Sequence, residues 1–266
     1  MSGRSRPETV TAYVRAAARA FEMSMKLRAI NAFTNFGWLA FPLIFVVLAL
    51  ALLGGGGRSA YAILGGGLLG YWGMAYVEGG NEIQNERWSG TLEQIMGCPT
   101  PLAVIVVGKL CSSLMFGAIS FLPAIAVAYF GFHQSLQNID LAPFVVSFLV
   151  LTFAFFCMAV TLAPLYAMWR WAFSVTNGFE IGVYVLGGFM FPISQLPAWL
   201  QAVASIFAPT WAVRSLYAAT GQPFGHSYAL WWSVSIVLSC AYLVIAWFLY
   251  RMVDVRARAT GQLALA

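Results

Sequence analysis

Charged residues are scarce in this chain. Asp, Glu, Lys and Arg together make up 9% of its 266 residues, whereas a soluble domain carries roughly 25%. Hydrophobic residues make up 61% of the sequence, which is more apolar surface than one water-surrounded core can hold. The composition therefore excludes a soluble globular protein and predicts an integral membrane protein, and the helix-length apolar segments given below predict that it is all-α.

Residues that carry common enzyme chemistry are also rare. The two histidines, His133 and His226, both fall in predicted outer loops. An intramembrane serine hydrolase needs a Ser–His pair at membrane depth, so that class is disfavoured. The four cysteines have no CxxC or metal-like spacing, and they are interpreted as packing residues. The net charge of +5 is spread thinly and has no basic aromatic platform, which excludes nucleic acid as a partner.

Six segments are apolar and long enough to cross a bilayer as helices, which takes about 20 residues. These predicted spans cover residues 36–53, 60–77, 110–130, 141–168, 172–191 and 228–250. A seventh stretch, 192–217, contains three prolines and amphipathic pieces. We expect it to form short re-entrant helices in the outer leaflet rather than a full crossing.

Lys and Arg residues orient these spans, because cytoplasmic loops carry the excess of both. With six spans, twelve of the fourteen lie on the side of the N-terminus, and only Arg58 and Arg214 lie on the other. The distribution predicts a multi-pass protein of the plasma (inner) membrane with both termini in the cytoplasm.

Residues 8–28 show the periodicity of an amphipathic helix. Arg15, Arg19, Glu22 and Lys26 fall within a narrow sector at 100° per residue. The opposite side is apolar and carries Val10, Tyr13, Val14, Ala17, Phe21 and Met25. A basic amphipathic helix of this kind is typical of a segment that lies in the membrane interface.

An acidic segment separates the second and third predicted spans. Four of the nine acids fall within sixteen residues there, namely Glu78, Glu82, Glu86 and Glu93. We expect a short helix that Gly90 interrupts or packs tightly, ended by Pro99 and Pro101. One side of that helix would be apolar, through Trp88, Leu92, Ile95 and Met96. A solvated spacer has no need for these residues, so the segment favours a protein–protein contact.

Three segments resemble motifs of a known family. The run 85–96 reads N-E-R-W-S-G-T-L-E-Q-I-M, followed by P-T-P at 99–101 and G-K at 108–109. It resembles the E-R-x-x-G-T-L-E-Q segment of ABC type-2 permeases, the membrane subunits of one class of ATP-binding-cassette exporter. The run 187–200, G-G-F-M-F-P-I-S-Q-L-P-A-W-L, resembles a second family element. The run 208–213 resembles a third, with Ala208 in place of the usual Asn.

The resemblance implies a connecting helix at 8–28 and a coupling helix at 82–96, both contacting an ATPase subunit. Carried over by position, the ATPase-contact residues are Glu82, Glu86, Arg87, Gly90, Thr91, Leu92 and Glu93. Glu86 and Glu93 are expected to meet basic side chains of the ATPase. The family pattern also implies two ATPase copies, a second permease copy as a homodimer, and export of a lipophilic or amphipathic substrate such as a drug, antibiotic, lipid or glycan-linked compound.

ATP hydrolysis is not expected in this chain. A P-loop requires G-x-x-x-x-G-K-[ST]. The one candidate, Gly108-Lys109, has Ala103 and Leu110 at the other two required positions. We therefore expect a non-catalytic subunit without a cofactor of its own, with ATP and Mg²⁺ bound by the partner ATPase. A secondary transporter or channel, which would need no ATPase, is the alternative.

The transport route has weaker candidates. An acid within a span usually faces the bundle interior or a wet cavity, so Glu180 is either a pathway or gating residue or a carboxylate bonded to Asn177, Thr176 or Arg170. Glycines in the second span and at Gly178 and Gly182 indicate close helix packing. The aromatic residues beside them either line a route or pack against helices and lipid; they are Tyr71, Trp72, Tyr76, Phe179, Tyr184 and Phe189.

Overall fold

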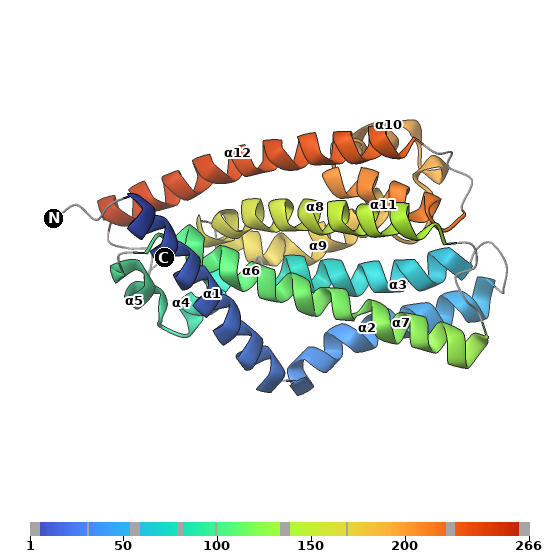
Figure 1. Ribbon diagram of the computed structural model, residues 1–266, viewed down its shortest axis with the longest axis horizontal. Coiled ribbons are helices and arrows are strands. Elements are labelled where there is room, and N and C mark those ends of the chain that lie inside the picture. The colour runs from blue at the N-terminus through green and yellow to red at the C-terminus, as the bar shows by residue number, and fades with distance from the viewer. Residues whose placement is uncertain are drawn as a thin grey trace.

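The helices run along one long axis as a bundle in the computed structural model (Figure 1). The structure describes residues 6–30, 32–53, 59–78, 82–98, 100–133, 139–168, 170–221 and 227–260. Within these ranges all regular structure is helical and no strand occurs, which confirms the predicted all-α class.

Three helices are long and apolar enough to cross a membrane. They are Leu102–Gly131, Leu141–Leu165 and Tyr228–Val253. The first comprises α6 (Leu102–Ile119), α7 (Phe121–Ala126) and η2 (Val127–Gly131). The second lies in α8 (Leu141–Met168) and the third in α12 (Tyr228–Thr260). Many apolar side chains of α12 are exposed, as expected for a helix that faces lipid.

The other three predicted spans are helical but shorter or incompletely described. They correspond to α2 (Ala32–Leu53), to α3 (Ser59–Gly73) continued by η1 (Met74–Glu78), and to α9 (Arg170–Leu186). Each residue from 60 to 76 is buried, so α3 is the central helix and is surrounded by protein rather than lipid. Six membrane crossings therefore remain a prediction, while a membrane protein is supported.

Glycines of α3 let its neighbours approach closely, as their density predicts. A Cβ atom on Gly66 would lie 2.2 Å from Cγ2 of Val46 in α2. One on Gly67 would lie 2.3 Å from the ring of Phe121 in α7. Around Gly178 and Gly182 of α9, in contrast, a Cβ would meet nothing within 4 Å among the described atoms. The predicted close packing thus holds within this chain for α3 and is not found at α9.

Helix α1 (Arg6–Ile30) crosses α6 near one end of the bundle (Figure 1). The predicted polar sector is exposed, and Glu22 pairs with Lys26 at 2.6 Å on its surface. Ser24 and Arg28, in contrast, are buried. Val10 and Val14 on the predicted apolar side remain exposed. The buried face of α1 is therefore more polar than the sequence indicates.

Short helical segments occupy the opposite end. They are η3 (Ile193–Gln195), α10 (Ala198–Ala204) and α11 (Ala208–Ala218), and Figure 1 places α10 and α11 far from α4 and α5. The region 192–217 is therefore built of short helices. Their insertion into a leaflet remains a prediction.

Candidate coupling interface

The predicted coupling segment is a pair of short helices. Helix α4 (Glu82–Trp88) and helix α5 (Leu92–Gly97) are separated by a turn at Gly90. Gly90 has φ +70°, a left-handed conformation that glycine adopts without a steric penalty. The amide N–H of Thr91 donates to the carbonyl of Glu86 at 3.0 Å and closes the turn. The glycine therefore interrupts the helix, one of its two predicted roles.

Glu82 lies at the centre of a buried ion network. Only 6% of its surface is exposed. Its Oε1 accepts a hydrogen bond from Nη2 of Arg28 in α1 at 2.8 Å. Its Oε2 pairs with Nζ of Lys109 in α6 at 3.0 Å. One carboxylate thus connects α4 to two other helices.

Glu86 completes the network on the side nearest solvent. Its Oε1 pairs with Nζ of Lys109, and its Oε2 accepts a hydrogen bond from the hydroxyl of Thr91. Arg28 also donates to Oγ of Ser113 at 2.7 Å. Two cations and two carboxylates are therefore brought together, so the charges compensate one another in a site where an unpaired charge would be costly.

The environment of Glu86 keeps it ionised. Burial raises the pKa of its carboxyl, but the hydrogen bonds from Lys109 and Thr91 and the positive charge of Lys109 outweigh burial and lower that pKa below its ordinary value. At neutral pH the carboxylate is therefore charged, and the ion pair with Lys109 is intact.

This lowered pKa predicts a stability loss in acid. The contribution of the Glu86 carboxylate is fully present above the ordinary glutamate pKa of about 4.3. It is lost as the pH falls through the lower pKa of the folded state. We expect the wild type to melt above Glu86→Gln at pH 7, and the difference in melting temperature to shrink in acid. A difference that stays constant down to pH 3 would contradict the ion pair.

Gly108 allows α1 to reach α6. A Cβ at this position would lie 2.3 Å from the backbone oxygen of Ala17 and 3.0 Å from Cβ of Ala20. The Gly-Lys dipeptide therefore has two separate roles. Gly108 permits the close approach of α1, and Lys109 closes the ion network one residue later.

The predicted ATPase-contact residues separate into three groups. Glu82 and Glu86 were expected to face a partner, but their carboxylates turn inward to Arg28 and Lys109. The reason is that two cations of the same chain lie within reach, Arg28 on α1 and Lys109 within α6. Gly90 is exposed and Thr91 is half-buried. Trp88, predicted only for the apolar side of this segment, is 62% exposed. The side chains of Arg87, Leu92 and Glu93 lie outside the described part of the structure.

Three network residues were not among the predicted site residues. Arg28 enters the sequence analysis only as a charge that sets the topology, Ser113 as a residue of the third predicted span, and Lys109 as a topology charge and as part of the G-K motif. One feature of the sequence could have identified the two cations, because charges close to an apolar span usually pair with one another. In a chain with so few charges, acids at 82 and 86 point to cations nearby.

The six aromatic route candidates lie in the main core. Tyr71, Trp72, Tyr76 and Phe189 are fully buried, Tyr184 is buried, and Phe179 packs against the same cluster. Tyr71 donates its hydroxyl hydrogen bond to Thr152 at 2.8 Å. These contacts agree with the expectation that the six aromatic residues pack against neighbouring helices. That any of them lines a transport route remains a prediction.

Glu180 has a partner on its own helix. Its Oε1 accepts a hydrogen bond from the hydroxyl of Tyr184. The side chains of residues 170–177, which include the predicted partners Arg170, Thr176 and Asn177, lie outside the described part of the structure. A gating role for Glu180 therefore stays a prediction.

Comparison with known proteins adds no assignment. No protein-family model matches the sequence, and no curated protein matches it as a relative. The motifs and the geometry of the ion network are therefore the features that bear on function.

Proposed function

We propose that this chain is the permease subunit of an ATP-driven exporter of the ABC type-2 class. One observation carries the proposal. The residues that give the family resemblance at 85–109 gather around one structural unit. Gly90 makes the turn, Thr91 and Lys109 hold Glu86, and Gly108 seats α1. Motif residues that are separate in the sequence therefore stabilise the same pair of helices, α4 and α5, and their contacts with α1 and α6.

The ion network supplies a mechanical link. A force applied to α4 and α5 reaches α1 through Glu82 and Arg28, and reaches α6 through Lys109. Helix α6 begins the candidate span 102–131. Because packed helices move as rigid elements, a displacement of α4 is passed to the membrane part of the bundle. ATP and Mg²⁺ would act on the partner ATPase.

The exposed surface of α4 and α5 is the proposed docking site. Trp88 projects from it with 62% exposure, and tryptophan is a preferred anchor at protein interfaces. Ser89, Gly90, Gln94, Gly97 and Cys98 are also exposed. Glu82 and Glu86 hold α4 against α1 and α6 on its buried side. The exposed side chains of α4 and α5 would contact the ATPase.

A second copy of the chain completes the proposed assembly. Gly178 and Gly182 lie one helical turn apart on α9, a Cβ at either position would meet nothing within 4 Å in the described part of the structure, and Ile181 beside them is exposed. Small residues at this spacing let two membrane helices approach closely. We propose a homodimer with two ATPase subunits, both termini in the cytoplasm, and export of a lipophilic or amphipathic compound.

Purification of the tagged chain from its own membranes tests the proposal. We expect a P-loop ATPase to co-purify, and the particle mass to correspond to two permeases and two ATPases. ATP hydrolysis by the particle should fall when the ATPase is removed. A chain that purifies alone and moves solutes without ATP would contradict the proposal and favour a secondary transporter or channel.

A further inference from the structure

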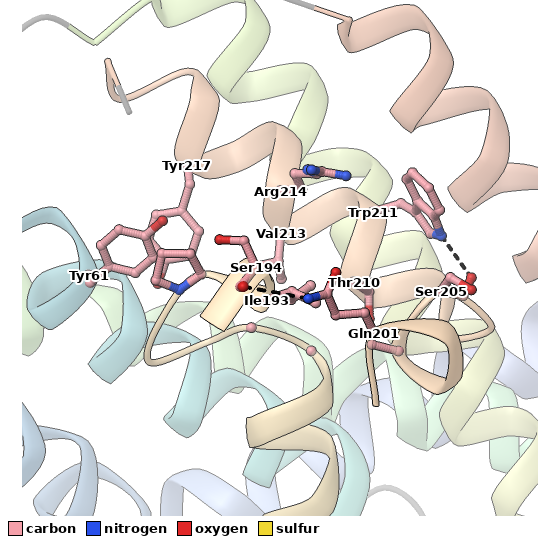
Figure 2. A pocket seen from close by; sticks show the side chains of 14 residues that line it. Tyr61, Ile193, Ser194, Gln201, Ser205, Thr210, Trp211, Val213, Arg214 and Tyr217 are labelled. Atoms are coloured by element: carbon pink, nitrogen blue, oxygen red, sulfur yellow. Dashed lines mark hydrogen bonds between the residues drawn. The ribbon is translucent and has the colours of Figure 1, made fainter. Parts of the chain in front are cut away.

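A cavity of about 140 Å³ lies at the end of the bundle opposite the ion network. Its walls come from α3, from the segment between α9 and α10, and from α10 and α11. Figure 2 shows Tyr61 reaching it from α3, Gln201 from α10, and Trp211 and Tyr217 from α11. The coupling interface at the other end of the bundle uses none of these residues.

Tyr61 brings an unused hydroxyl group to this cavity. Its ring is stacked on that of Tyr217, with the ring centroids 4.3 Å apart, and only 8% of the residue is exposed. The hydroxyls of Tyr61 and Tyr250 both lack a hydrogen bond within the described ranges, but that of Tyr250 is sealed in the interior and that of Tyr61 is accessible. An accessible hydroxyl on an otherwise buried residue is available to a molecule in the cavity.

The other buried side chains of the wall have already used their donors. Gln201 and Trp211 donate to the backbone oxygens of Leu196 and Ser205, at 2.7 and 2.9 Å. Thr210 donates to another backbone oxygen at 3.1 Å, and the hydroxyl of the stacked tyrosine of α11 donates to a fourth. Among the buried residues of the described cavity wall, Tyr61 is therefore the one whose side-chain donor is unused.

The charges around the cavity favour an uncharged ligand. Its described lining residues include no Asp, Glu or Lys. Arg214 is exposed and already has a partner, since its guanidinium lies 5.6 Å from the ring centroid of Trp231. A charged ligand would have to draw Arg214 from that position, whereas an uncharged ligand avoids the cost of burying a charge.

The size and lining of the cavity favour a single ring. A cavity of about 150 Å³ holds one benzene molecule, so one ring with a small substituent fits here and a whole lipid does not. Tyr61, Trp211 and Tyr217 line the cavity together with aliphatic side chains such as Ile193 and Val213. Contacts between aromatic rings add to the gain from burial alone. An aromatic ring therefore gains more here than an alkyl chain of similar size.

We propose that this cavity binds a small uncharged aromatic molecule whose ring carries an oxygen acceptor, as in an aryl ether or a phenol. The hydroxyl of Tyr61 donates a hydrogen bond to that oxygen. The ring packs against Trp211 and the aliphatic side chains of the wall. Neither the ion network nor a partner ATPase takes part, so the site is tested separately from the proposed function.

Calorimetric titration of the purified chain in nanodiscs measures this binding, with empty nanodiscs as the blank. Anisole and ethylbenzene have nearly the same shape, but only anisole has an oxygen that accepts a hydrogen bond. We expect anisole to bind about threefold to tenfold more tightly, the usual effect of one hydrogen bond between uncharged groups. Butyl methyl ether has the oxygen but no ring, and it should bind about threefold more weakly than anisole because it makes no aromatic contact.

Tyr61→Phe removes the hydroxyl and keeps the ring that stacks on Tyr217. In this variant anisole and ethylbenzene should bind equally. Tyr129→Phe is the matched control, because Tyr129 is exposed and lies on η2, outside the cavity wall. It should keep the preference of the wild type for anisole.

Equal binding of anisole and ethylbenzene to the wild type would overturn the proposal, and so would an anisole preference that Tyr61→Phe retains. Equal binding of butyl methyl ether would indicate a groove for alkyl chains and would overturn it as well. Absence of anisole binding would mean that the cavity holds only water, which also contradicts the proposal. The wild-type comparisons hold even when Tyr61→Phe fails to fold.

Discussion

Glu82→Ala will lower the free energy of unfolding by about 3–5 kcal/mol, the usual cost of removing one partner of a buried ion pair. The substitution leaves Arg28 and Lys109 in a buried site without the carboxylate that both of them share. Repulsion between the two cations adds to the loss of their bonds. Chemical denaturation of the purified chain in mixed micelles measures the effect.

Glu22→Ala is the matched control for this prediction. Glu22 also pairs with a cation, Lys26, at 2.6 Å, but the two side chains are 63% and 67% exposed. Exposed pairs contribute little because water and salt screen them. We expect no measurable change for Glu22→Ala. Equal losses of unfolding free energy for the two substitutions would show that the buried Glu82 network stabilises the fold no more than an exposed ion pair does.

Gly108→Ala will displace α1 from α6. The added methyl group would lie 2.3 Å from the backbone oxygen of Ala17, and a backbone atom cannot move aside as a flexible side chain can. Overpacking of this kind costs typically about 1–3 kcal/mol. Since Arg28 is on the displaced helix, its bond to Glu82 is weakened as well. Faster tryptic cleavage within α1 reports the undocking, because cleavage follows local opening.

Gly97→Ala is the control that tests whether any glycine-to-alanine substitution in this region would displace α1. Gly97 ends α5 and does not have a positive φ, and a Cβ added to it would meet nothing within 4 Å among the residues that the structure describes. We expect cleavage of α1 at the wild-type rate in this variant. Unchanged cleavage and stability in Gly108→Ala would mean that α1 and α6 are not packed as closely as described.

Local features of the fold follow well from the sequence. Apolar runs predict the helices, and Gly90 predicts the break between α4 and α5, because few other residues adopt its backbone conformation. The third predicted span begins at residue 110, whereas α6 begins at Leu102. Lys109 lies within this helix, where the carboxylates of Glu82 and Glu86 compensate its charge.

The partners within the ion network could not be predicted from local patterns. Arg28 and Glu82 are 54 positions apart, and their contact depends on how α1 crosses α6. That crossing depends on Gly108. The packing role of Gly108 cannot be predicted from the sequence, because its close neighbour, Ala17, is distant along the chain. The sequence therefore locates the acidic segment, but it does not show that the cations paired with Glu82 and Glu86 come from α1 and α6 of the same chain.

The most direct test of the coupling account is a photo-crosslinking residue placed at Gln94, which is exposed on α5. A second variant carries it at Trp199, which is exposed on α10 at the opposite end of the bundle. On illumination of native membranes, the account predicts a crosslink from position 94 to a P-loop ATPase and none from position 199. No ATPase adduct at position 94, or equal adducts at both positions, would contradict it.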